Sequence, residues 1–213
     1  DIPELAGTLH CALGLAPVAA GRLLGIDLAA LRAMPGVVRV FTAADIPGTN
    51  DWGSIMHDDP ILCDGDIRYL GQPVFAVVAE TRGEALRTAA LAKKLVRVEA
   101  APPVLTPQEA HARGQYVVPP MLLVRSSSGL DEAGIRARIA AAPHRLQGQL
   151  DVGGQEQFYL EGQISYAIPK EAGGMHVHCS TQHPSEMQHL VAHALGVPAH
   201  AVLVECRRMG GGF

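Results

Sequence analysis

Short apolar runs alternate with polar and glycine-containing stretches through the first hundred residues, and this pattern predicts alternating strands and helices. Three extended segments are expected there, at 9–13, 22–26 and 37–41. Asp27 can cap a short helix that runs to Met34, where Pro35 follows and ends it. The stretch 49–66 contains glycine, proline and several aspartates, so we expect a long irregular excursion.

The clearest local unit is a strand, a helix and a second strand. Residues 73–79 are apolar on both faces, which is typical of a buried strand. Thr81 and Glu84 have the spacing of a capping box and are expected to open a helix over 85–93. Apolar and polar residues alternate in 95–99, which is the next strand. The pattern therefore predicts a β-α-β unit.

The pattern changes after residue 105. Residues 106–145 contain paired prolines and a serine run, which favours an extended connector with one short helix from Asp131 to about Ala142. A helix over 184–195 is expected later, with Gly196 just past its end. Strands are predicted at 145–150, 157–167, 175–180 and 201–204. We therefore expect three parts, the last one incomplete: 1–105, 106–145 and 146–213.

Composition narrows the class of protein. The 213 residues contain 17 Lys+Arg and 21 Asp+Glu, a formal charge of −4, which argues against nucleic-acid binding. No apolar run is long enough to span a bilayer, and the first residues do not resemble a signal peptide. The four cysteines form no C-x-x-C pair, so we expect reduced thiols in a cytoplasmic protein that binds no membrane: Cys11, Cys63, Cys179 and Cys206.

The chain ends in a glycine-rich segment, Gly210 to Phe213, directly after the apolar run 201–204. Glycine lets the backbone approach a ligand closely, and such loops present N–H groups, usually to an anion. A linker or a plain turn is the alternative interpretation. Natural domains rarely end in such a loop, so we expect this chain to be a piece of a longer protein.

Three motifs of the second half stand in one order and spacing: 153–161 (GGQEQFYLE), 180–182 (STQ) and 208–213 (RMGGGF). The first half adds 41–47 (FTAADIP) and 67–74 (IRYLGQPV). With these motifs the chain resembles the molybdenum-cofactor subunit of the xanthine dehydrogenase/aldehyde oxidase family, in particular the bacterial xanthine dehydrogenases with split subunits. The resemblance extends over nearly the whole chain.

The resemblance implies an α+β fold. It assigns an α/β hammerhead domain to residues 1–105 and a linker with a short helix to 106–145. Residues 146–213 are then the start of a molybdopterin-binding domain.

The resemblance also implies an activity. Enzymes of this family hydroxylate a carbon next to a ring nitrogen, here converting hypoxanthine and xanthine to urate, and they take the oxygen from water. Electrons pass through 2Fe-2S centres to FAD, both on a partner subunit or domain, in an expected homodimer of heterodimers. The family's catalytic glutamate lies beyond residue 213. We therefore expect no catalytic residue in this chain and no activity from the chain alone.

Three cofactor-binding residues follow from the resemblance: Gln182, Gly212 and Phe213. In the family the pterin dithiolene holds the molybdenum, and the glutamine of the Ser-Thr-Gln motif reaches its apical oxo group. A neutral amide donates to such an acceptor without adding charge, and backbone N–H groups of a glycine loop suit a polyanionic pterin. In the alternative interpretation, Gln182 ends a strand and bonds the backbone near Pro184.

Histidines offer a second candidate site. His176 and His178 share a strand face beside Cys179, and His189 and His193 lie four apart on the predicted helix, a spacing that can bind zinc. The helix lacks the glutamate that zinc proteases place after the first histidine, and no further cluster completes a tetrahedral site. We therefore expect no metal ligand among the side chains, and a buried Cys179 that behaves as a small hydrophobe.

Two other functions stay open. The enzyme could oxidise aldehydes or other N-heterocycles, because the pocket residues that decide the substrate lie outside this chain. Alternatively, the chain could be a folded module that docks a partner subunit and holds no cofactor.

Overall fold

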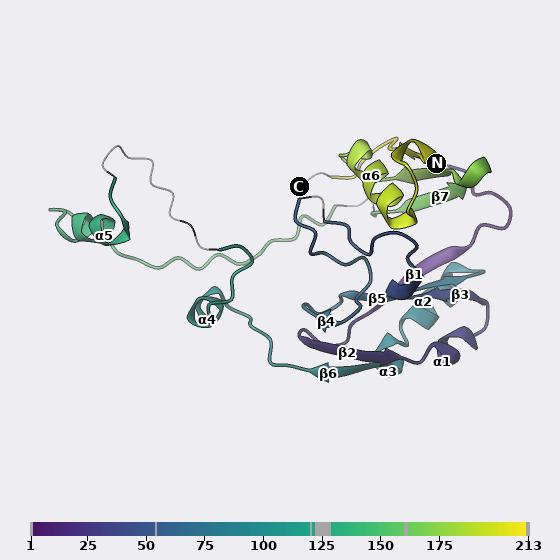
Figure 1. The fold of residues 1–213 in the computed structure, drawn as a ribbon. Helices are drawn as coiled ribbons and strands as arrows, with labels where there is room; N and C mark the ends of the chain where they lie inside the picture. The colour runs from purple at the N-terminus through teal and green to yellow at the C-terminus, as the bar shows by residue number, and fades with distance from the viewer. Residues whose placement is uncertain (1, 54, 120, 122–128, 160–161, 212–213) are drawn as a thin grey trace. The chain divides into compact units, whose positions relative to one another are not determined.

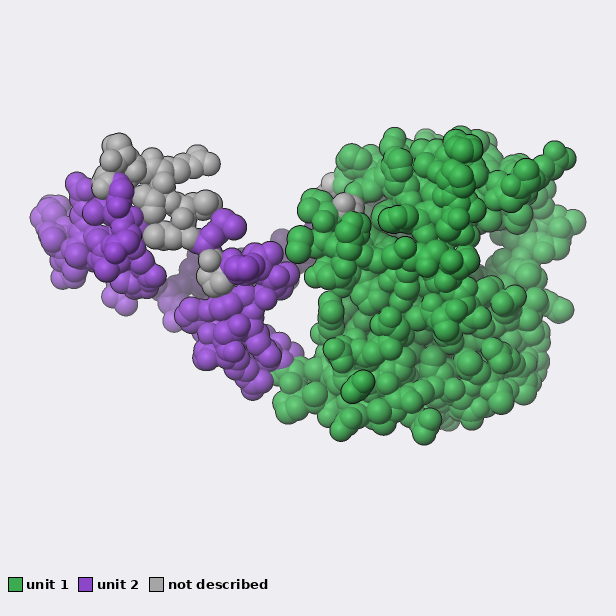
Figure 2. Space-filling model, viewed as in Figure 1, with its two compact units in different colours: residues 1–103, 159–213 green, residues 104–158 purple. Residues whose placement is uncertain are grey.

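The computed structural model describes residues 2–53, 55–119, 121, 129–159 and 162–211 (Figure 1). The chain divides into two compact units, shown in separate colours in Figure 2. Unit 1 combines residues 1–103 with 159–213, and unit 2 is the intervening segment 104–158. Unit 1 contains all of the strands that the structure describes.

The first sheet has the strand order β1-β5-β3, and both of its pairs are antiparallel. Its strands are β1 (His10–Leu15), β5 (Pro73–Ala79) and β3 (Val37–Phe41). Side chains on both faces of β5 are inaccessible to solvent, including Val74, Phe75 and Val77. The apolar run predicted to be a buried strand is therefore the central strand of this sheet.

The second sheet corrects one prediction. Its order is β4-β2-β6, all antiparallel. Its strands are β4 (Asp66–Ile67), β2 (Gly21–Ile26) and β6 (Val96–Ala100). The strands expected at 73–79 and 95–99 both form, but they lie in different sheets, so the predicted β-α-β unit is wrong. A run buried on both faces fits a central antiparallel strand as well as a parallel one, and β1 and β3 occupy both edges of β5.

Local capping chemistry was predicted correctly. Asp27 accepts a hydrogen bond of 3.0 Å from the Ala30 N–H and begins α1 (Leu28–Arg32). The capping box of Thr81 and Glu84 begins α2 (Arg82–Ala89). The expected single helix over 85–93 is instead two, because the chain turns after α2 and a short α3 (Ala92–Leu95) follows. Buried residues of these two sheets and of their helices form one core, with Leu31, Val40, Phe75, Ala85 and Val96 among its members.

The third sheet holds the only parallel pair among the described strands. Its order is β7-β8-β9, with β7 (Ser165–Pro169), β8 (Met175–Cys179) and β9 (Val202–Glu205). β7 runs antiparallel to β8, and β8 runs parallel to β9 across the helix α6 (Pro184–Leu195). Gly196 ends α6 in the left-handed conformation, with φ of 68°, as predicted. Three short 3-10 helices complete this unit: η1 (Ala43–Asp45), η2 (Glu171–Gly173) and η3 (Ala199–Ala201).

Unit 2 contains two helices, α4 (Pro107–Ala112) and α5 (Glu132–Ala140). α5 was predicted, whereas α4 was missed although Thr106 caps it and Pro107 opens it. The strand predicted at 145–150 is wrong, and the next one begins only at Ser165. A strand needs a hydrogen-bonded neighbour, and the described part of unit 2 offers none. It also contains no buried side chain.

A backbone contact within unit 1 joins the excursion after η1 to the C-terminal end of α6. The Gly48 N–H donates to the Ala194 carbonyl and the Thr49 N–H to the His193 carbonyl, each at 3.0 Å. These carbonyls belong to the last turn of α6, where the carbonyl groups of a helix run out of intrahelical donors, and the His193 carbonyl also accepts from the Gly196 N–H at 3.2 Å. A Cβ on Gly48 would collide with the His193 carbonyl oxygen and lie 2.6 Å from the Gly196 nitrogen. Only glycine allows the two segments to approach this closely.

We predict that Gly48→Ala lowers the free energy of unfolding by about 1–3 kcal/mol, because the added methyl group must push two backbone segments apart. Gly65→Ala is the matched control, since nothing lies within 4 Å of its added Cβ. Equilibrium urea unfolding of both variants measures the difference. Equal stability of the two variants would contradict the contact.

Candidate functional site

One edge of the third sheet collects segments that are distant in the sequence. β8 and β9 are parallel, so the segments that leave their C-terminal ends start from the same edge. Residues 180–182 follow β8, and residues 206–211 follow β9. Ligands of sheets with parallel strands usually bind outside such carboxyl ends. The parallel pair therefore brings two of the three predicted motifs to one place.

Gln182 lies in the turn between β8 and α6, with an exposed side chain. The turn is shaped by Thr181, whose Oγ1 accepts a hydrogen bond of 3.1 Å from the His183 N–H. The carboxamide of Gln182 makes no hydrogen bond with any residue that the structure describes. The alternative, in which this amide bonds the backbone near Pro184, is therefore not observed. The amide is available to a ligand.

The first turn of α6 adds a partial positive charge beside Gln182. Pro184 is the first residue of this helix, and no side chain caps its N-terminal N–H groups. Uncapped N–H groups at a helix N-terminus favour anions. Arg207 and Arg208 add two cationic side chains to the segment that leaves β9, whereas Glu186 is the acidic residue in the first turn of α6. The edge is therefore rich in donors suited to an anionic group.

Gln188 connects α6 to the beginning of β9 through two side-chain hydrogen bonds. Its Nε2 donates to the Val202 carbonyl at 2.7 Å and to the Ala199 carbonyl at 3.1 Å. Ala192 of α6 is buried, as are Val177 of β8 and Val202 of β9. The helix thus packs on the sheet through apolar side chains and one amide. This packing keeps the two segments of the candidate site at the same edge.

The remaining predicted residues are only partly described. Gly212 and Phe213 lie outside the described residues, so their expected role stays a prediction. In the first motif, residues 153–158 belong to unit 2 and form no regular element, and residues 160–161 lie outside the described part. The structure therefore places Gln182 and the start of the glycine segment at one edge of the third sheet.

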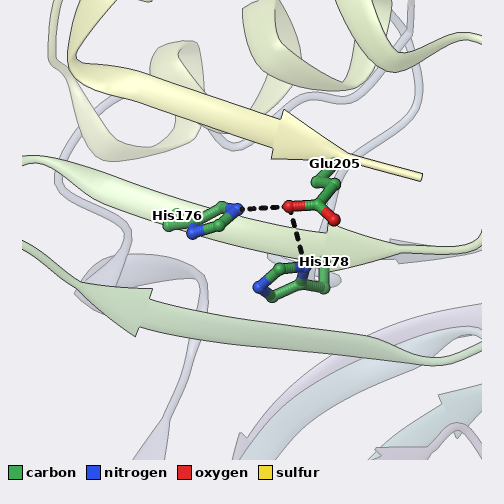
Figure 3. Close-up of side chains that lie close together, drawn as sticks. All are labelled: His176, His178 and Glu205. Carbon is green, nitrogen blue, oxygen red and sulfur yellow. Dashed lines mark ion pairs between the residues drawn. The ribbon is translucent and has the colours of Figure 1, made fainter. Parts of the chain in front are cut away.

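A cluster that sequence reasoning missed in part lies on the strands themselves (Figure 3). His176 and His178 of β8 share one face, as predicted, and Glu205 of β9 joins them there. Glu205 was missed because only the register, which pairs His178 with Glu205, reveals the contact. His189 and His193 of α6 are exposed and belong to no such group among the described residues.

The charge state of this cluster is set by its neighbours. Arg207 Nε donates to Glu205 Oε1 at 2.7 Å, and this bond holds the pKa of the Glu205 carboxyl below its usual range. The two histidines lower the same pKa further, while partial burial opposes them. Glu205 is therefore ionised at neutral pH.

Cysteine chemistry does not contribute to the site. All four thiols are free, as expected for reduced cysteines. Cys179 is buried, and burial raises the pKa of its thiol. A protonated thiol is a weak nucleophile, so Cys179 acts as a small apolar side chain, as predicted.

No helix of the described chain is both long and apolar enough to cross a membrane.

Two protein-family models match the chain. One, described as "Aldehyde oxidase and xanthine dehydrogenase, a/b hammerhead domain", matches residues 1–101. The other, described as "Molybdopterin cofactor-binding domain", matches residues 124–213. These matches confirm the predicted α+β fold, in which a hammerhead domain precedes a molybdopterin-binding segment.

Curated relatives extend the likeness over the whole chain. It is 36% identical over 217 residues to a xanthine dehydrogenase of Drosophila pseudoobscura pseudoobscura and 34% identical over 214 residues to a xanthine dehydrogenase/oxidase of Gallus gallus. Each alignment covers 100% of this chain but 15% of the relative. The chain therefore spans about 15% of the length of the curated relatives it matches.

Solved structures show the same fold. An aldehyde oxidoreductase of Desulfovibrio gigas aligns with a TM-score of 0.77 at 24% identity, over 99% of this chain and 24% of that one. A quinoline 2-oxidoreductase of Pseudomonas putida 86 aligns with a TM-score of 0.76 at 27% identity, over 99% of this chain and 28% of that one.

We predict that Gln188→Leu lowers the free energy of unfolding by about 1–3 kcal/mol, because the Val202 and Ala199 carbonyls lose their donor. Gln182→Leu is the matched control and should change the stability by less than about 0.5 kcal/mol, since its amide is exposed and unbonded. Chemical denaturation of the two variants tests the contrast. A larger loss in the Gln182 variant would show that its amide is structural.

Proposed function

Because the chain belongs to the xanthine dehydrogenase/aldehyde oxidase family of molybdenum-cofactor proteins, we propose that it is part of a purine hydroxylase. In this proposal hypoxanthine and xanthine are oxidised to urate, water supplies the oxygen, and each hydroxylation releases two electrons. The support is the insect and bird xanthine dehydrogenases, which align with all of this chain at 36% and 34% identity.

The edge of the third sheet fits a molybdopterin. The single observation that supports it best is the unbonded Gln182 amide. It lies in the turn between the C-terminal end of β8 and the uncapped N-terminus of α6. An anionic phosphate or pterin needs N–H donors of this kind. When bound, the cofactor supplies the centre that accepts the two electrons of the substrate.

Each protein group then has a separate role. The Gln182 amide is neutral, so it can donate to an electron-rich oxygen of the cofactor without changing the charge around it. The backbone of Gly212 and Phe213 would hold the cofactor through N–H groups that need no rearrangement. We assign no catalytic acid or base to this chain, and we propose that the chain alone is inactive.

Partners follow from the same proposal. Electrons would leave through 2Fe-2S centres to FAD on another subunit or domain, and the complete enzyme would be a cytoplasmic homodimer of heterodimers. Within the chain we propose a hammerhead domain at 1–105, a linker at 106–145 and the start of the molybdopterin-binding domain at 146–213.

Two alternatives have specific support. The solved neighbours act on other substrates by their names, an aldehyde oxidoreductase and a quinoline 2-oxidoreductase, so oxidation of an aldehyde or another N-heterocycle is the second candidate. The third is a docking module without cofactor, favoured by large exposed apolar side chains such as Leu146, which is fully exposed, and Val117, which is 95% exposed.

We expect the full-length protein, produced with molybdenum-cofactor maturation, to contain about one molybdenum per chain, because each chain has one cofactor site. It should oxidise xanthine faster than benzaldehyde or quinoline. Elemental analysis and a substrate panel in water labelled with oxygen-18 measure both. If the protein contains molybdenum but oxidises benzaldehyde or quinoline faster than xanthine, the proposed substrate is wrong while the role as a molybdenum hydroxylase stands. If it contains no molybdenum, the docking module is favoured.

We expect Gln182→Ala in the full-length protein to lower kcat by about 10- to 100-fold, since it removes a donor to the cofactor. Subunit assembly and molybdenum content should be unchanged. Gln108→Ala, on the exposed surface of α4, is the matched control. If the Gln182→Ala variant contains its full molybdenum and turns over as fast as the unchanged protein, Gln182 does not contact the cofactor.

A further inference from the structure

The His176, His178 and Glu205 cluster is not used by the proposed function. It lies on the side of β8 and β9 that these three side chains share, with the histidines two residues apart on one strand and the glutamate on the next (Figure 3). One ligand atom from each, two imidazole nitrogens and one carboxylate oxygen, lies within 4.8 Å of the other two.

The two distances from the carboxylate oxygen to the imidazole nitrogens match those between the ligands of a metal ion. Oε2 of Glu205 is 3.4 Å from Nε2 of His176 and 3.6 Å from Nδ1 of His178. An ion held at about 2.0–2.1 Å from each tetrahedral ligand places those ligands about 3.3 Å apart. The ring centroids of the two histidines are 4.0 Å apart, and one nitrogen of each ring faces Oε2 of Glu205 (Figure 3).

The two histidine nitrogens that face Glu205 make no hydrogen bond. Nε2 of His176 and Nδ1 of His178 are both buried, and neither has a hydrogen-bond partner. Buried polar atoms in folded proteins nearly always have a partner, so two such atoms aimed at one carboxylate oxygen need an explanation. A cation between the three atoms would satisfy all of them at once.

The surroundings hold the ligands in place. Arg207 occupies Oε1 of Glu205 and leaves Oε2 directed at the histidines. The Tyr166 ring stacks on His178 at 6.3 Å, and its hydroxyl accepts a hydrogen bond of 3.0 Å from the Leu5 N–H. Such outer contacts orient metal ligands in known sites.

We propose that His176, His178 and Glu205 bind a divalent transition-metal ion of the Zn²⁺ class. Two imidazoles and one carboxylate suit Zn²⁺ and leave a fourth position for water. The site is formed by side chains of β8 and β9 themselves, and it does not depend on the proposed function. The bound ion links β8 to the last residue of β9, directly before the segment that leads to the glycines.

The test measures Zn²⁺ binding by the full-length protein, purified without a histidine tag, at a pH of about 7.5, because metal affinity falls as the solution becomes more acidic. We expect one zinc per chain at this site. Glu205→Gln keeps the shape of the side chain and should weaken Zn²⁺ binding by at least about 10- to 100-fold, the cost of losing even an outer contact of a metal site. Co²⁺ in place of Zn²⁺ should give the absorption bands of a tetrahedral ion, which disappear in the variant.

The matched control is His189→Ala with His193→Ala, which removes the exposed histidine pair of α6 and should leave Zn²⁺ binding intact. No zinc binding by the unchanged protein, or binding lost only in this control, would overturn the proposal. Thermal unfolding in EDTA checks that Glu205→Gln still folds. His176→Phe is a second test, and unchanged zinc affinity in either cluster variant would also overturn the site.

Discussion

The parallel pairing of β8 with β9 is the constraint on which both candidate sites of this chain depend. It brings the segment after β8 and the segment after β9 to one edge, and the same register sets Glu205 beside His178. Helix α6 enforces this pairing by packing apolar residues on one face and by bonding the start of β9 through Gln188. Both candidate sites therefore depend on the same connection, from β8 through α6 to β9.

The contrast between the two candidate sites lies in their surroundings. Gln182 is exposed and unbonded at the end of a strand, next to the positive end of a helix, as suits an external anionic ligand. The histidines lie within the sheet, where two buried nitrogens face Glu205 but make no hydrogen bond. A small cation suits the second environment, whereas a large anionic cofactor suits the first.

Sequence reasoning succeeded where the deciding chemistry is local. Asp27 and the pair Thr81 and Glu84 signal helix starts within four residues, and Gly196 signals a helix end. It failed where the structure depends on pairing with a strand that is distant in the sequence. The strand predicted at 145–150 has no neighbouring strand to pair with. β5 and β6 lie in different sheets because β5 pairs with β1 and β3, whereas β6 pairs with β2. Gln182 was predicted from a motif and stays a prediction, whereas Glu205 was missed because strand register is not visible in the local sequence.

Unit 2 interrupts unit 1 in the sequence without adding a buried side chain of its own among its described residues. In entropic terms it acts as a closed loop between β6 and β7. The free-energy cost of closing a flexible loop grows only with the logarithm of its length, by about 0.6 kcal/mol for each doubling. The length of this insertion can therefore vary widely among related chains while the fold of unit 1 keeps nearly the same stability.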